Sequence, residues 1–170
     1  LAFEDPLLES VRQTWLAWDG MLETESVGGT VYEFTRKALS RILLTAVSSH
    51  PDVYERFVGR GCQPTMFRVC EFQGKDVNAL FSLLERADSP VWERAGDRGQ
   101  VLRQALEVAV GEMRETLGTD MAQWKWGRVH QVSFRHAVAI NPVLAPIFNV
   151  GPFPIGGDTD TVCQTSMQPE

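Results

Sequence analysis

The sequence predicts a mostly α-helical chain with a few β-strands near its C-terminal end. Apolar residues recur at helical spacing through roughly the first 118 of the 170 residues. After Gly118 the spacing shifts toward the period of two that is typical of a strand. Hydrophobic residues make up 44% of the chain and charged residues 22%, so the chain can bury a core, and an intrinsically disordered protein is excluded.

Two helices are expected before residue 50. Asp5-Pro6 opens the first, because Asp accepts from free helical N–H groups and Pro is tolerated at the first position; Gly20 ends it. The second follows Gly28-Gly29 over about 31–48. Its positions Arg36, Lys37 and Arg41 are expected on a solvated face. The two apolar stripes are Leu8, Val11, Trp15 and Trp18, and then Val31, Phe34, Ala38, Leu39, Ile42 and Ala46.

Breaks and caps divide the middle of the chain. His50-Pro51 ends the second helix, and we expect a short helix over Asp52–Val58 and then a loop over 59–75 with one short strand inside it. Asp76 caps another helix, which Asp88-Ser89-Pro90 closes. The clearest helix spans about 98–117, starts after Gly96-Asp97 and stops at Gly118.

Strands and turns are expected beyond residue 118. The near-alternation from Trp124 to Phe134 predicts a strand over about 126–134, followed by a turn at Asn141-Pro142 and a short helix within 143–149. Gly151-Pro152-Phe153-Pro154 is expected to form neither helix nor strand, and Thr161–Thr165 a strand. We therefore divide residues 1–170 into a helical part, 1–118, and a strand and coil part, 119–170. Because a lone strand needs neighbours, the chain is interpreted as one segment of a larger protein.

Charge and hydropathy exclude some partners. The net charge is −6, and residues 31–150 carry 13 acids against 15 bases without a basic patch. Binding to nucleic acid or to a membrane surface is therefore not expected. No apolar run approaches the roughly 20 residues that span a bilayer. The chain starts at Leu1 without a leader, so we expect a processed, truncated or excised start.

The reactive residues of the sequence do not form a recognisable active site or metal site. Cys62, Cys70 and Cys163 form no C-x-x-C pair, and a Cys62–Cys70 bridge and buried free thiols both stay open. His130 and His136 would lie about 20 Å apart on one strand, which makes them poor co-ligands. Asp158-Thr-Asp160 resembles the start of a calcium loop but lacks the later ligands. No metal is expected in this segment. A Cys163–His130 pair is conceivable, but a buried thiol is more common, and no catalytic motif occurs.

The tryptophans have a simpler interpretation. Trp15 and Trp18 are spaced as on one helix face, and Trp124 and Trp126 flank a predicted strand start. An aromatic or carbohydrate ligand site is one possibility. Packing in the core is the commoner role of residues in such positions, and we favour it.

Two stretches of the sequence carry a resemblance. The first is Trp15-Leu-Ala-Trp-Asp-Gly-Met-Leu-Glu-Thr-Glu-Ser26, followed by Val31-Tyr-Glu-Phe-Thr35. The second is Trp124-Lys-Trp-Gly-Arg-Val-His130, followed by Pro142-x-Leu144, Phe148-Asn-x-Gly151-Pro and Gly156-Gly157-x-x-x-Thr161-Val162. Their order, and the helical region between them, resemble the large chain of the penicillin acylase (penicillin amidase) family.

The resemblance implies a fold and an activity. The family belongs to the N-terminal nucleophile hydrolases, whose precursors cleave themselves and whose fold is a four-layer αββα sandwich. A new N-terminal Ser then attacks amides such as penicillins, cephalosporin side chains or acyl-homoserine lactones, with its own amino group as base. The sequence alone leaves the compartment unknown, and the resemblance implies a periplasmic or secreted protein. The implied partners are the remaining chains of the same hydrolase.

The catalytic residues of the family do not transfer to this sequence. The Ser-Asn-x-Trp start of the large chain is absent, and the oxyanion-hole residues and any calcium ligands would lie elsewhere in the intact enzyme. The segment itself is expected to hold no cofactor and to be inactive alone. Structural roles are expected for Trp126, Gly127, His130, Gly156 and Gly157. His130 would be a hydrogen-bonded histidine that fixes its strand, or alternatively a polar contact near the active centre.

A second hypothesis stays open at this point. The chain could be an independent helical binding module that shares the motifs by descent or chance. A segment cut from a sandwich would expose apolar faces and bind a hydrophobic dye, whereas an independent module would unfold cooperatively as a monomer.

Overall fold

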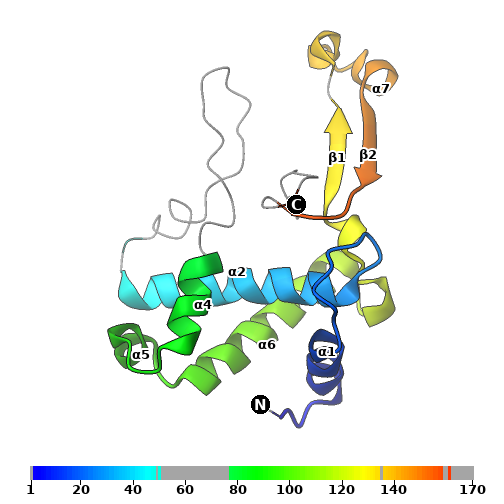
Figure 1. The fold of residues 1–170 in the computed structure, drawn as a ribbon. Helices are drawn as coiled ribbons and strands as arrows, with labels where there is room; N and C mark the ends of the chain where they lie inside the picture. Colours follow the sequence, from blue (N-terminus) through cyan, green and yellow to red (C-terminus); the bar gives the residue numbers. More distant parts are fainter. Residues whose placement is uncertain (1, 49, 51–76, 135, 159–160, 162–170) are drawn as a thin grey trace.

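Helices dominate the computed structural model, which describes residues 2–48, 50, 77–134, 136–158 and 161. The described residues contain one antiparallel pair of strands, so the mostly α prediction is confirmed (Figure 1). The expected helix at 52–58, the loop at 59–75 and the strand at 161–165 lie outside the described residues or almost wholly so. The α-helices are α1 (Pro6–Leu16), α2 (Val27–Val47), α4 (Val77–Glu85), α5 (Pro90–Ala95), α6 (Arg98–Leu117) and α7 (Ala145–Phe148).

The caps of α1 and α2 explain where these helices begin. The Asp5 carboxylate accepts from the backbone N–H groups of Leu7 and Leu8 at 2.7 and 3.3 Å, as the sequence predicts. Helix α2 begins at Val27, earlier than expected, because the Ser26 hydroxyl accepts from the Gly29 N–H at 3.0 Å. The glycine pair therefore lies inside the first turn. A Cβ on Gly28 would lie 2.5 Å from the Trp18 Cβ, so glycine lets the preceding segment pack against the helix.

Helices α4, α5 and α6 follow one another with short connections. Helix α5 was not expected; Ser89 caps it and Pro90 occupies its first position. The clear helix at 98–117 is confirmed. Asp97 caps it through the Gln100 N–H at 2.9 Å, and Gly118 ends it at a φ of +91°, a conformation that favours glycine. We call α1, α2, α4, α5 and α6 the helical body.

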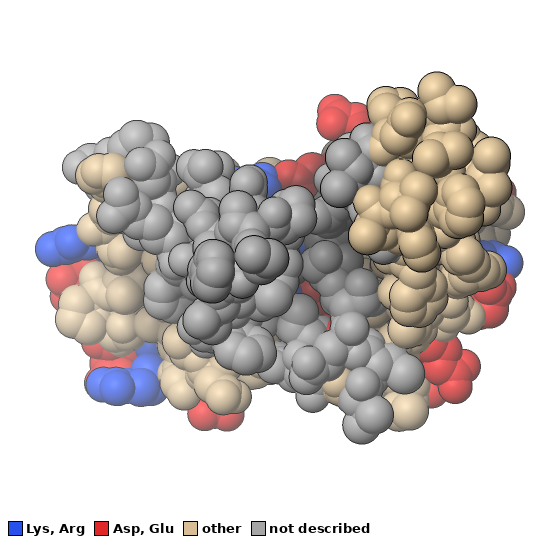
Figure 2. All heavy atoms as spheres, turned by 90° about the horizontal axis from the view of Figure 1, so that it is seen from above, with Lys and Arg blue, Asp and Glu red and all other residues tan. Residues whose placement is uncertain are grey.

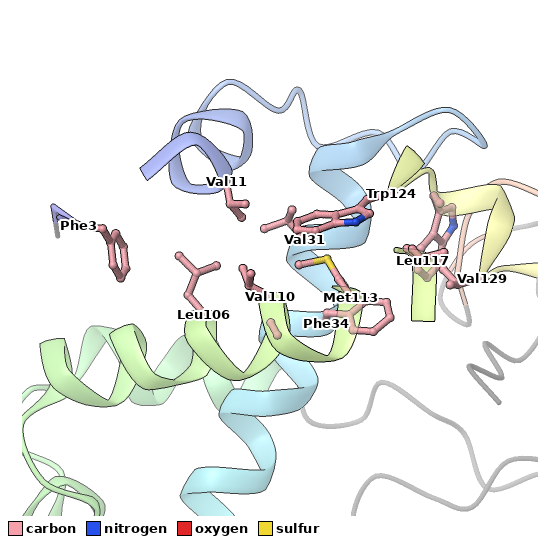
Figure 3. Packing of buried hydrophobic residues seen from close by; sticks show 12 residues of the cluster. Phe3, Val11, Val31, Phe34, Leu106, Val110, Met113, Leu117, Trp124 and Val129 are labelled. Carbon is pink, nitrogen blue, oxygen red and sulfur yellow. The ribbon is translucent and has the colours of Figure 1, made fainter. Parts of the chain in front are cut away.

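Two groups of buried apolar residues hold the body together. The first lies where α1, α2 and α6 meet and extends to Trp124 and Trp126 (Figure 3). It consists of Phe3, Val11, Val31, Phe34, Leu106, Ala109, Val110, Met113, Leu117, Trp124, Trp126 and Val129. The second joins α2 to α4, α5 and α6 through Ala38, Leu39, Leu43, Leu80, Trp92, Val101 and Ala105. The expected packing role of Trp124 and Trp126 is thus seen directly.

The basic residues of α2 do not form a simple solvated face. Arg36 pairs with the buried carboxylate of Glu33 at 2.8 Å, and both side chains are under one-tenth exposed. Arg41 is more exposed and pairs with Glu112 of α6 at 2.6 Å. Burial lowers the pKa of Lys37 to about 8, which the neighbouring Glu33 and Glu112 only partly oppose. The expectation of a solvated face is therefore wrong for Arg36, because α2 is covered on more than its apolar stripe.

A hairpin projects from one end of the body (Figure 1). Strand β1 (Gln131–Phe134) pairs antiparallel with β2 (Val150–Pro154), and the short helices η3 (Ala137–Ile140) and α7 connect them. We call residues 131–154 the arm. Two expectations are wrong here: the predicted strand at 126–134 begins only at Gln131, and Gly151–Pro154 lies in a strand. Residues 151–152 fall at an irregularity in the pairing, where glycine and proline are tolerated.

Candidate functional site at the junction of three segments

Three segments that lie far apart in the sequence meet where the arm leaves the body. They are residues 22–26, between α1 and α2; residues 126–130, which contain η2 (Trp126–Arg128); and residues 155–157, which follow β2. We call them the junction. They contain parts of both stretches that resemble the penicillin acylase family.

Backbone hydrogen bonds join the three segments. The N–H groups of Trp126 and Gly127 donate to the carbonyls of Ser26 and Thr24 at 3.0 and 2.7 Å. The Gly157 N–H donates to the Leu22 carbonyl at 2.7 Å. The segment at 22–26 therefore bonds both to the residues that precede the arm and to those that follow it.

Trp126 is the largest side chain at the centre of the junction. It is almost fully buried, and its indole N–H donates to the Gly157 carbonyl at 2.8 Å. Its ring stacks on the imidazole of His130, with 4.8 Å between centroids and 17° between planes. One side chain thus contacts the start and the end of the arm, and its polar atom is satisfied despite burial.

His130 is also fully buried. Its Nδ1 lies 2.9 Å from the Ile155 carbonyl oxygen, while the Ile155 N–H donates to the His130 carbonyl at 3.1 Å. A carbonyl can only accept, so this contact assigns the proton to Nδ1. The imidazole is therefore fixed in orientation and in tautomer, and no part of it is open to solvent.

Two glycines permit the close approach of these segments. A Cβ on Gly127 would lie 2.9 Å from the Pro154 Cβ and 3.1 Å from the Thr24 carbonyl oxygen. A Cβ on Gly156 would lie 2.8 Å from the Leu22 carbonyl oxygen. Any other residue would push the segments apart at two places, so the glycines are required by the spacing of the backbones.

The structure brings together every residue for which a structural role was expected: Trp126, Gly127, His130, Gly156 and Gly157. Their energetic roles stay predictions. The predicted strand over 126–134 is not what brings Trp126 and His130 together, because Trp126 belongs to a 3-10 helix. Phe134 lies on the arm and is exposed. The part played by the carbonyls of Leu22 and Thr24 was missed; the first motif contained both residues, but a backbone contact leaves no signature in the sequence.

Reactive groups are sparse in the part of the chain that the structure describes. No three His, Cys, Asp or Glu side chains are grouped as metal ligands among these residues. Cys62, Cys70, Cys163 and Asp160 lie outside them, so the disulfide, the Cys163–His130 pair and the calcium-like Asp158-Thr-Asp160 stretch are not tested. No described helix has the length and the hydropathy that crossing a bilayer requires.

Known proteins with similar sequences are acylases. The chain is 27% identical over 164 residues to penicillin acylase 2 proenzyme of a Pseudomonas species, covering 95% of the chain and 19% of that protein. It is 25% identical over 159 residues to the acyl-homoserine lactone acylase QuiP of Pseudomonas fluorescens, covering 86% of the chain and 17% of that relative. The QuiP acylase of Pseudomonas aeruginosa matches over 100 residues at 27% identity.

The family assignment follows from a match along almost the whole chain. The penicillin amidase family model matches residues 3–170. The chain therefore belongs to the penicillin amidase family, as its two motif stretches indicated. It spans about one-fifth of the length of the relatives that it matches.

Proposed function

We propose that the chain is a non-catalytic segment of a penicillin-acylase-type amide hydrolase. The enzyme would cleave acyl groups from β-lactams, acyl-homoserine lactones or similar amides. One observation carries this proposal: the family match covers residues 3–170, yet the matched stretch makes up only 17–19% of two acylase relatives. The remaining polypeptide would supply the N-terminal Ser, its oxyanion hole and most of the αββα sandwich.

Within that enzyme the segment would act as a scaffold. The body contains its own buried core, and the junction fixes the arm to it through hydrogen bonds between backbones. Contacts of this kind support a precise orientation of one element against another. The segment would thus position the arm within the rest of the enzyme and take no part in proton transfer.

The surroundings of His130 support the scaffold role over a catalytic one. A general base must lie within hydrogen-bond reach of the proton that it removes, and so must face the substrate. The His130 ring is fully buried, stacks on Trp126 and contacts the Ile155 carbonyl. The family chemistry would also have its own base in the amino group of the nucleophile.

The test compares the 170-residue chain with the protein that is expressed from the complete reading frame. Both are purified and assayed on a chromogenic phenylacetyl amide and on a long-chain N-acyl-homoserine lactone. We expect hydrolysis by the complete product, which should begin its large chain with Ser-Asn-x-Trp, and none by the 170-residue chain. Hydrolysis by the 170-residue chain alone would overturn the proposal. A reading frame limited to these residues would favour an independent module.

A further inference from the structure

The surface of the arm differs in composition from that of the body. Residues 136–157 contain no Asp, Glu, Lys or Arg. Seven large apolar side chains of the arm are more than two-fifths exposed. Figure 2, which looks down on the arm, shows it as a continuous uncharged area, whereas charged atoms lie around the body. The seven are Phe134, Val138, Val143, Ile147, Phe148, Val150 and Phe153.

The strand register places part of this apolar surface on one face. Val132 is paired with Phe153, and Phe134 is paired with Val150. Directly opposite residues share a face, and so do alternate residues of one strand. Val132, Phe134, Val150 and Phe153 therefore form one apolar face of the hairpin, while Gln131, Ser133 and Pro154 belong to the other.

An uncovered hairpin of this kind has little stability of its own. A two-stranded sheet is marginal in water unless another layer covers its apolar face. A cluster of exposed apolar side chains on one face of a protein is typical of an interaction surface. The larger body exposes Leu16 and Phe81 but buries most of its large apolar side chains, so the exposure is concentrated on the arm.

The outer edge of β2 argues against simple strand addition there. The Ile155 N–H points toward the strand partner and donates to the carbonyl of His130, the residue just before β1. The backbone of the preceding residue, Pro154, therefore faces away from β1, and as a proline it has no N–H to offer. Pro152 lies at the pairing irregularity. A partner on this side would dock by side-chain packing rather than by extending the sheet.

We propose that the apolar face of the arm docks against the polypeptide that accompanies this segment in the complete hydrolase. The inference rests on the proposed function. The matched stretch leaves more than four-fifths of the acylase relatives as polypeptide that could cover it. The absence of charge over 136–157 fits a layer of apolar side chains and does not fit a charged partner.

Hydrogen exchange of the complete protein and of the 170-residue chain tests this docking. We expect the amides of 131–134 and 150–153 to exchange at least about 100-fold more slowly in the complete protein, while those of α6 change far less. An arm that exchanges equally fast in both forms would overturn the inference. So would an arm already protected in the 170-residue chain, because the chain would then cover it itself.

Substitutions locate the docking surface. The double variant Phe134→Ser/Phe153→Ser alters the arm, and Leu16→Ser/Phe81→Ser removes similarly exposed apolar side chains from the body as a matched control. In the 170-residue chain, the arm variant should lose most of its binding of anilinonaphthalene sulfonate, and the control should keep it. In the complete protein, only the arm variant should lose the exchange protection. Equal effects of the two variants would overturn the proposal.

Two further measurements separate the possible outcomes. Sedimentation of the 170-residue chain should show a monomer. A dimer that the arm variant abolishes would mean that a second copy of the chain covers the apolar face, and it would overturn the proposal. Hydrolysis is measured separately on the complete protein. An active hydrolase with an unprotected arm refutes the docking alone, whereas an inactive protein with a protected arm refutes the proposed function alone.

Discussion

The helical body and the arm use apolar residues in opposite ways. In the body, Val11, Val31 and Met113 are fully buried between α1, α2 and α6. On the arm, Val143 and Ile147 are 77% and 70% exposed. Both regions are rich in apolar residues, so the apolar content alone does not distinguish a buried core from an exposed apolar surface. The distinction comes from charge: charged residues surround the apolar positions of the body, whereas the arm from 136 onward has none.

The largest difference between the regions should appear when one buried tryptophan is removed. Trp124 is fully buried, and its indole N–H donates to the Gly118 carbonyl at 2.8 Å. Trp124→Ala should lower the free energy of unfolding of the 170-residue chain by about 3–5 kcal/mol. Phe153→Ala on the arm should change it by less than about 0.5 kcal/mol. Urea unfolding followed by circular dichroism measures both, and similar losses would contradict the distinction between the regions.

His130 tests the connection between the regions. His130→Ala removes the stack on Trp126 and leaves the Ile155 carbonyl without this donor, so we expect a loss of about 2–4 kcal/mol in the free energy of unfolding. The exposed His136 of the arm is the control, and His136→Ala should cost no more than about 1 kcal/mol.

Under the proposed function, the complete protein gives a second measurement on the His130 variant. We expect a lower yield of matured enzyme but nearly unchanged turnover per active site, titrated with a covalent serine reagent. A catalytic base would instead lose about 100-fold or more in turnover. Normal maturation with a large loss of turnover would place His130 in the active site.

Alanine substitutions at two glycines compare the cost of a steric clash at the junction with the gain in helix propensity in α6. Gly127→Ala forces a Cβ against Pro154 and Thr24, and should cost about 1–3 kcal/mol and speed hydrogen exchange in β1 and β2. Gly111 lies within α6 with open space around it, so Gly111→Ala should stabilise the body by about 0.5–1 kcal/mol. A stabilising Gly127→Ala would show that the junction is loosely packed.

The smallest effect that we expect is a pH dependence confined to the body. The pKa of Lys37 is lowered by burial to about 8, so between pH 8 and about 10.5 the unfolded chain binds more protons than the folded one. The contribution of Lys37 to stability therefore rises with pH through this window. Because the side chain is partly exposed, Lys37→Met should stabilise the protein at pH 7 by only about 1–2 kcal/mol and remove the rise.

The control for Lys37 is Lys125, a partly exposed lysine that forms an ion pair. Lys125 contacts Glu25 at 2.6 Å, but both side chains are more than one-third exposed. Lys125→Met should change stability by less than about 1 kcal/mol at pH 7 and leave the alkaline rise intact. Thermal unfolding at pH 7, 9 and 10.5 compares the two variants. An unchanged rise in Lys37→Met would assign the effect to another group.

The sequence predicted most helix ends correctly where local signals determine them, but the expectation that Gly20 ends the first helix is wrong, because α1 ends at Leu16. Asp5-Pro6 and Gly118 mark helix ends through contacts within a few residues, and the structure places both ends there. The start of α2 was misplaced because Gly28 and Gly29 suggest a break, whereas the tight contact with Trp18 requires glycine inside the helix. Local propensity thus failed where a contact with another segment decides the residue type.

The junction and the arm were harder to predict for the same reason. Trp126 and Gly157 are 31 residues apart, and no periodicity indicates that the indole N–H of one reaches the carbonyl of the other. Alternation from Trp124 onward suggested one long strand, but the bonds of Trp126 and Gly127 to 24–26 hold η2 in place of its first half. Family resemblance singled out these residues, and only the fold explained why they lie together.

The hydrogen bonds between His130 and Ile155 hold the two ends of the arm next to each other. The polypeptide leaves the body at one point and returns beside it, so the length of the loop between these residues places no constraint on the packing of α1, α2 and α6. Insertions and deletions within 135–149 should therefore be tolerated by the body, and the same scaffold can carry arms of different length and shape. This part of the chain can change in length and shape while the helices beside it keep their packing.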